Sequence, residues 1–117
     1  MNKVFISGKI LDTPTLRVEN GTAPHLVLAL SVRHKTRSGE ARWEAYRISA
    51  WNGVAQWGAA NLTRGQTVAV HGYLTQRQIS AGEASAITTE IAAEEFFPLR
   101  SLRAEAPPDA AEPGQSA

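Results

Sequence analysis

The sequence predicts an all-β fold, a small barrel of five strands with one short helix between the third and fourth strands. Three features support this prediction. Apolar and polar side chains alternate along most of residues 4–91, which is typical of half-buried strands. Turn signals separate the alternating runs. One alanine-rich run, residues 53–62, instead has spacings of three and four, which indicates a helix.

The strands are expected at residues 4–10, 26–33, 43–51, 68–75 and 87–91. Asp12-Thr-Pro14 interrupts the first strand, and Asn20-Gly21 favours a tight turn because both residues accept a positive φ. Further turns are expected at residues 37–40 and 80–83. On the helix, Trp57 is expected to plug one end of the barrel with Val54 and Leu62.

The order of three strands, one helix and two strands is that of an OB barrel. Gly8 and Gly72 lie inside predicted strands, where glycine often marks the bulge or bend that a small barrel needs at its corners. A plain antiparallel sheet with one helix is the alternative. In either case the chain of 117 residues holds one domain, residues 1–100, followed by a segment, 101–117, whose composition predicts a disordered tail.

Charge is distributed unevenly along the chain. Residues 1–82 carry ten basic and four acidic residues, whereas residues 83–117 carry two basic and seven acidic ones, so the net charges are +6 and −5. This asymmetry is compatible with a basic binding surface, although charges scattered over a solvated surface would also explain it.

An enzyme is disfavoured because no set of residues assembles a nucleophile, a base and an orienting group. The chain has no cysteine, and His25, His34 and His71 lack the spacing of a helical metal site. Residues 53–58 have the glycine spacing of a P-loop but lack the lysine that follows it. We expect no catalytic residues, no metal and no cofactor.

No apolar run is long enough to span a membrane, and the first residues read as a strand and not as a signal peptide. We therefore expect a cytoplasmic protein without a membrane partner.

Strand parity points to a binding surface. In residues 43–51, Trp43, Arg47 and Trp51 lie on one face, whereas the opposite set, Glu44, Tyr46, Ile48 and Ala50, reads as core. Tyr73 and Arg77 share a parity on the fourth strand. Flat aromatic rings beside cations suit single-stranded nucleic acid, whose bases stack on the rings while the cations contact phosphates. A protein interface is the alternative interpretation for the tryptophans.

In order and spacing, several motifs resemble the bacterial single-stranded DNA-binding protein family, an OB-fold group, over residues 1 to about 92. They are Asn2-Lys3-Val4, Gly8, Asp12-x-Pro14 with Arg17, Asn20-Gly-Thr22-Ala, Ser38-Gly39-Glu40, Arg47, Leu62-x-Arg64-Gly65-Gln66-x-Val68, Gly72-x-Leu74 and Thr88-Thr89-Glu90. The resemblance implies sequence-tolerant binding and protection of single-stranded DNA in replication, recombination or repair. It places Trp51 at a stacking position, Arg64 and Arg77 along the DNA path, and Lys9 on the groove face.

The expected DNA-binding residues combine this resemblance with the parity argument and the basic stretch at residues 33–42. They are Lys9, Arg33, Lys35, Arg37, Arg42, Trp43, Arg47, Trp51, Arg64, Tyr73 and Arg77. Ala45 and Ile79 stand where the family commonly has stacking tryptophans, and Trp43 and Tyr73 are expected to compensate. These losses predict weaker stacking and a larger electrostatic share of the affinity.

The resemblance also bears on partners. It implies a homo-oligomer, a tetramer by preference or a dimer, assembled through the first strand and the position of Tyr46. The family's acidic tip with a terminal Pro-Phe pair is missing, which puts recruitment of replication proteins through that tip in doubt. A relative of primosomal replication protein N, acting mainly through protein partners in replication restart, is the alternative, and Pro24-His25 loosely resembles that protein.

Overall fold

The computed structural model describes residues 1–99 as six strands and one helix. In chain order these are β1 (Val4–Ile10), β2 (Thr15–Arg17), β3 (His25–Lys35), β4 (Ala41–Trp51), α1 (Asn52–Asn61), β5 (Thr67–Ala81) and β6 (Ala84–Pro98). The sheet order is β1-β5-β6-β4-β3-β2, and an additional pairing of β1 with β3 closes the five long strands into a barrel. This confirms the predicted OB architecture.

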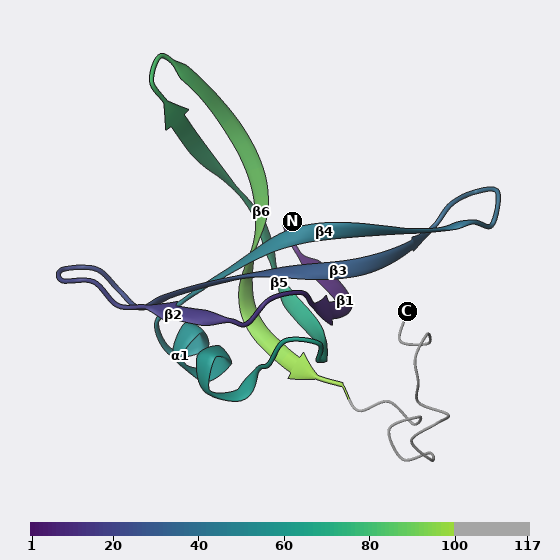
Figure 1. Ribbon diagram of the computed structural model, residues 1–117, viewed down its shortest axis with the longest axis horizontal. Coiled ribbons are helices and arrows are strands. Elements are labelled where there is room, and N and C mark those ends of the chain that lie inside the picture. The colour runs from purple at the N-terminus through teal and green to yellow at the C-terminus, as the bar shows by residue number, and fades with distance from the viewer. Residues whose placement is uncertain (100–117) are drawn as a thin grey trace.

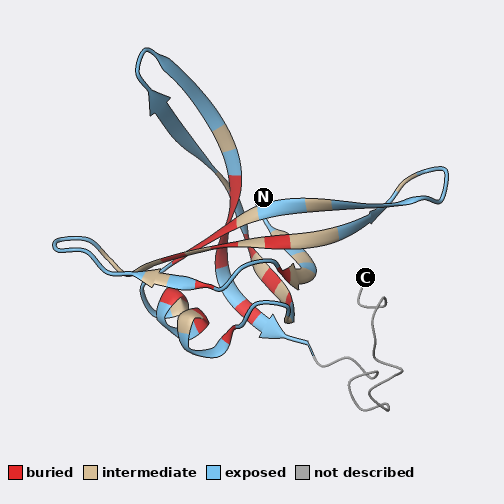
Figure 2. Cartoon of the chain, viewed as in Figure 1, coloured by how far each residue is buried: buried red, intermediate tan, exposed pale blue. Residues whose placement is uncertain are grey.

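Two hairpins extend beyond the barrel as arms, one formed by β3 and β4 and the other by β5 and β6 (Figure 1). The turns at their tips contain Gly39 and Gly82, with φ of 93° and 64°, as the turn signals predict. The buried residues gather where the strands cross, whereas the outer parts of both arms are exposed (Figure 2). The arms make β5 and β6 much longer than the sequence predicted, because their outer residues pair with each other without contributing to the core.

The core consists of branched aliphatic side chains from alternate positions of the strands, as the period of two predicts. The largest fully buried ones are Ile10, Leu26, Leu28, Leu30, Ile48, Val68 and Val70. Both strand glycines lie at close backbone contacts. A Cβ at Gly8 would lie 2.2 Å from the carbonyl oxygen of Ser31, and β5 and β6 shift register between His71 and Gly72.

The helix lies where the sequence predicted it, but Trp57 does not plug the end of the barrel as expected. Ala55 and Gly58 are buried on the inner face of α1, and Leu62 closes the barrel end just after it, with Val54 half-buried against the core. A Cβ at Gly58 would lie 2.9 Å from Leu26 Cδ2, so the helix approaches too closely for a large inner side chain. Trp57 is instead directed outward and is 42% exposed.

Three further details differ from the sequence analysis. The residues after Asp12-Thr-Pro14 form a sixth strand, β2, which pairs with β3. Tyr46 is 39% exposed, because its inward-facing position lies near the open end of the barrel beyond the reach of the core. Ser49 has the same strand parity as Arg47 and Trp51 but is buried, because it pairs with β3 on one side and β6 on the other.

Candidate nucleic-acid interface

A groove of about 350 Å³ lies on the outer face of the barrel where β2, β3, β4 and β5 meet. Its lining residues are Arg17, Glu19, Thr22, Ala23, His25, Val27, Arg47, Trp51 and Arg77. The strand register explains this grouping: Arg17 pairs with His25, and His25 pairs with Trp51, so one row of side chains crosses three neighbouring strands.

Trp51 and His25 form a stacked pair at the end of β4. Their ring centroids lie 3.8 Å apart with 9° between the planes. Trp51 is nevertheless 48% exposed, so part of the indole stays accessible. The next residue, Asn52, has φ of 55°, which turns the chain sharply from β4 into α1 and leaves Trp51 at the rim of the groove. Asparagine is among the side chains that tolerate this left-handed conformation.

The surroundings of His25 favour the neutral form of its imidazole. Partial burial lowers the pKa of His25 below its ordinary value of 6.5, and the neighbouring positive charge of Arg47 lowers it further, followed by those of Arg17 and Arg77. Glu90 acts in the opposite direction on the pKa. In its neutral form, the imidazole that stacks on Trp51 adds no positive charge to the arginines around it.

Two arginines of the groove converge on one carboxylate. Arg47 Nε on β4 donates to Glu90 Oε1 at 2.8 Å, and Arg77 Nε on β5 lies 3.6 Å from the same oxygen. Glu90 is only 8% exposed, whereas the arginine side chains are 37% and 45% exposed. The guanidinium groups therefore reach solvent above a buried anion.

The predicted residues at 33–43 lie on the β3–β4 arm and outside the groove. Arg33 pairs across the hairpin with Trp43, and Lys35 pairs with Ala41 next to the tip. Trp43 is 44% exposed. Among residues 1–99, Arg33, Lys35 and Arg37 form no ion pair, so this arm presents unneutralised positive charge.

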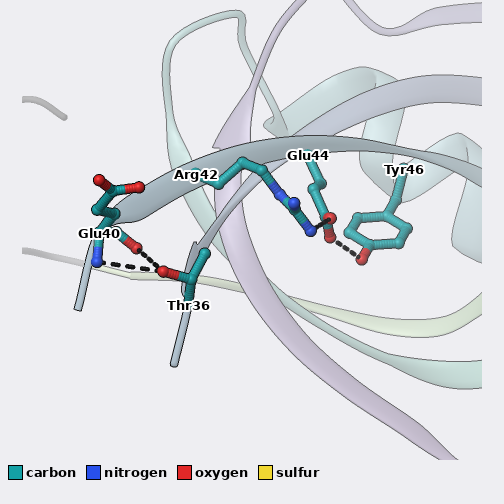
Figure 3. Close-up of polar contacts among 5 residues, drawn as sticks. All are labelled: Thr36, Glu40, Arg42, Glu44 and Tyr46. Carbon is teal, nitrogen blue, oxygen red and sulfur yellow. Dashed lines mark hydrogen bonds and ion pairs between the residues drawn. The ribbon is translucent and has the colours of Figure 1, made fainter. Parts of the chain in front are cut away.

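A row of polar contacts runs along β4 from the arm toward the barrel (Figure 3). Arg42 Nη2 donates to Glu44 Oε2 at 2.9 Å, and the Tyr46 hydroxyl donates to Glu44 Oε1 at 2.7 Å. The hydrogen bond from Tyr46 and the one from Arg42 lower the pKa of Glu44, and the same contact with Glu44 raises the pKa of Tyr46. At the tip, the Glu40 amide donates to Thr36 Oγ1 at 3.2 Å, which braces the turn.

The structure thus brings three of the predicted residues, Arg47, Trp51 and Arg77, into one groove. Arg33, Lys35, Arg37, Arg42 and Trp43 lie along the arm, and the remaining predicted residues lie elsewhere on the barrel. Lys9 is on β1, Arg64 is in the turn between α1 and β5, and Tyr73 is on β5, none of them lining the groove.

Arg17, His25 and Glu90 were not predicted as members of this region, although each belongs to a motif quoted above for a resemblance. A lone histidine before a strand gives no signal of its own. Only the β3–β4 register, which pairs His25 with Trp51, would have revealed it.

Within residues 1–99, no three histidine, aspartate or glutamate side chains come together as a metal site. No helix in this range has the length and apolar character to cross a membrane.

The closed barrel of five long strands, with one helix before β5 and an aromatic and cationic groove on its outer face, defines an OB-fold protein. Residues 1–99 match the model of the Single-strand binding protein family, and the chain belongs to this family.

One curated protein and one solved structure are similar to this chain. A "Single-stranded DNA-binding protein" of Caldanaerobacter subterraneus subsp. tengcongensis is 30% identical over 79 residues, which cover 66% of this chain and 53% of the relative. The chain therefore spans about half the length of this curated relative. A solved structure described as "Plasmodium falciparum SSB complex with ssDNA" superposes with a TM-score of 0.75 at 19% identity, covering 86% of this chain and 96% of the other, and so shares the fold.

Proposed function

We propose that this chain binds single-stranded DNA without strong sequence preference and acts by binding alone, in replication, recombination or repair in the cytoplasm. The observation that carries the proposal is the groove in which Trp51 lies beside Arg17, Arg47 and Arg77. An exposed indole offers a stacking surface to any base, and guanidinium groups bind phosphates. Membership of the single-strand binding family supports the same function.

The proposed path has two parts. Trp51 and the arginines of the groove hold one stretch of the strand, and the β3–β4 arm, with Arg33, Lys35, Arg37, Arg42 and Trp43, contacts a second stretch. Lys9, Arg64 and Tyr73 lie neither in the groove nor on the arm, and we propose them as further contacts of the strand. Since only one tryptophan lines the groove, electrostatic contacts to phosphates should supply a large share of the affinity.

The test is titration of the protein with oligo-dT, followed by tryptophan fluorescence at two salt concentrations. Saturable quenching is expected, and the affinity should fall with salt at a log–log slope of about −0.7 for each phosphate contacted. Trp51→Ala should lose about 1–3 kcal/mol of binding free energy if the indole stacks on a base.

Trp57→Ala is the matched control, because Trp57 is similarly exposed, at 42% against 48%, but does not line the groove. Its affinity should equal that of the unchanged protein. Absence of binding at low salt would contradict the proposed function, and equal losses for both tryptophans would remove Trp51 from the binding site.

We also propose that the chain works as a homo-oligomer, a tetramer by preference or a dimer. The apolar part of a hollow of about 420 Å³ at the open end of the barrel includes Val4, Ile6, Val32 and Leu74, beside Tyr46, and the rest of its lining includes Arg47, Thr88, Thr89 and Glu90. Along this end, β1 pairs with β3 only at Lys9 and Ile10, so the first part of β1 has one unpaired edge within the described chain. Covering the apolar hollow with a second copy would bury these side chains. The tail, residues 101–117, lies outside the described residues.

A further inference from the structure

Glu90 is a carboxylate next to a groove whose three arginines are suited to bind anions, and two of these arginines, Arg47 and Arg77, contact it. Its carboxylate is 8% exposed and belongs to β6, which pairs with β4 on one side and β5 on the other. Ile91 pairs with Ile48 and Glu90 pairs with Thr75, so the register delivers Arg47 and Arg77 to the two sides of the same carboxylate. Simple Coulomb attraction between the groove and phosphate would be stronger without Glu90.

The contact geometry suggests what Glu90 contributes. Both arginines approach Glu90 Oε1 through Nε, at 2.8 Å for Arg47 and 3.6 Å for Arg77. Within residues 1–99, their terminal Nη nitrogens form no hydrogen bond. A guanidinium has five N–H donors in a rigid plane, so a contact through Nε fixes the plane while the terminal donors remain available.

Without the carboxylate, two neighbouring guanidinium groups would repel each other and their long side chains would sample many rotamers. With it, both are restrained near one point of the groove wall, next to Trp51. Such preorganisation raises affinity by reducing the ordering that binding would otherwise require.

We propose that Glu90 is a positioning residue, which fixes Arg47 and Arg77 as a paired clamp for a phosphate of single-stranded DNA. This inference rests on the proposed function. It predicts a change in DNA affinity opposite to the change expected from charge alone. Glu90→Gln removes one negative charge from the site but releases the arginines, so the affinity should fall.

The experiment compares Glu90→Gln with Glu19→Gln in the oligo-dT titration. Glu19 lines the groove itself, is exposed, and forms no ion pair within the described chain, so its substitution removes the same charge without releasing an arginine. Glu19→Gln should bind about twofold tighter because repulsion of phosphate decreases. Glu90→Gln should bind about tenfold weaker because the clamp is lost.

The salt dependence separates loss of the clamp from a general folding defect. If the arginines no longer contact a phosphate, the log–log slope of Glu90→Gln should become shallower by about 0.7. A smaller active fraction would change the apparent stoichiometry and leave the slope unchanged. Tighter binding by Glu90→Gln, equal to that of Glu19→Gln, would overturn the inference, whereas failure of the unchanged protein to bind would overturn the proposed function instead.

Arg77→Lys provides a second variant, since a buried carboxylate next to arginines can be needed for folding. Arg77 is 45% exposed, so the protein should tolerate lysine there. Lysine keeps the charge but lacks the planar fork, so we expect about threefold weaker binding. An affinity equal to that of the unchanged protein would contradict the clamp even if Glu90→Gln does not fold.

Discussion

At the scale of single residues, the groove depends on pairs of side chains that support each other. His25 lies flat against Trp51, and Glu90 lies between Arg47 and Arg77. In the first group Trp51 is restrained by His25, and in the second the two exposed arginines are restrained by the buried Glu90. Arg47 and Trp51 were predictable because they share strand parity. Their supporting residues were not, since His25 and Glu90 come from other strands and only the register brings them close.

The lowered pKa of His25 predicts how folding stability depends on pH. Because the folded state holds a proton on His25 less tightly than the unfolded state, the unfolded state binds more protons near pH 6. The contribution of neutral His25 to folding stability is therefore complete above the ordinary pKa of 6.5. It is lost as the pH falls through the lowered pKa. The thermal midpoint should therefore fall more between pH 7.5 and 5 in the unchanged protein than in His25→Gln.

Differential scanning calorimetry at both pH values measures this difference. His34→Gln is a suitable control, because His34 is exposed on the β3–β4 arm and makes no contact with the groove. An equal fall in midpoint for the unchanged protein and His25→Gln would show that His25 does not contribute to the pH dependence.

At the scale of elements, close backbone contacts at glycines determine how the strands meet. The register shift at His71 and Gly72 bends β5 and β6 where the arm leaves the barrel. A Cβ at Gly72 would lie 1.9 Å from the carbonyl oxygen of Ala92, which is backbone and cannot rotate away. The two strand glycines were recognised from the sequence because glycine is unfavourable in strands without such a reason.

Gly72→Ala should therefore lower the free energy of unfolding by about 1–3 kcal/mol, since the strands must move apart to admit a methyl group. Urea denaturation measures the loss. Gly53→Ala is the control, because a Cβ at Gly53 would meet nothing within 4 Å. Its stability should stay within about 0.5 kcal/mol of the unchanged protein or increase slightly, as alanine favours the helix. Equal stabilities of the two variants would contradict the close contact at Gly72.

Element lengths were harder to predict than element positions. The periodicity located the five long strands and the helix, because each contributes a row of side chains to the core. The arms have no such row. The outer residues of β5 and β6, among them Ile79 and Ile87, are exposed, and their pairing follows from the turn at Gly82 and not from burial. The short strand β2 was missed because three residues are too few to show a period.

At the scale of the whole molecule, the described chain has apolar surface that no described element covers. Leu74 and Tyr46 are 49% and 39% exposed at the open end of the barrel. If a second copy covers this end, multi-angle light scattering should give a mass of two or four chains and not the 12.6 kDa of one. Leu74→Glu should shift the protein toward the single-chain mass, because a buried charge is costly.

Ile79→Glu is the matched control, as Ile79 is also exposed but lies on the β5–β6 arm away from this end. It should leave the mass unchanged. A mass of 12.6 kDa for the unchanged protein would contradict the proposed assembly.

The line along which β4 and β6 meet is a seam of the barrel, and it affects local stability as well as DNA binding. Strands β4 and β6 pair in parallel at only two positions, Ile48 with Ile91 and Ser49 with Ala92. The bond from Arg47 to Glu90 spans this seam immediately beside those positions. A short parallel pairing between distant parts of the chain is a natural place for local opening. Occupancy of the groove should thus slow amide hydrogen exchange along this seam, so that a ligand bound outside the barrel helps to keep it closed.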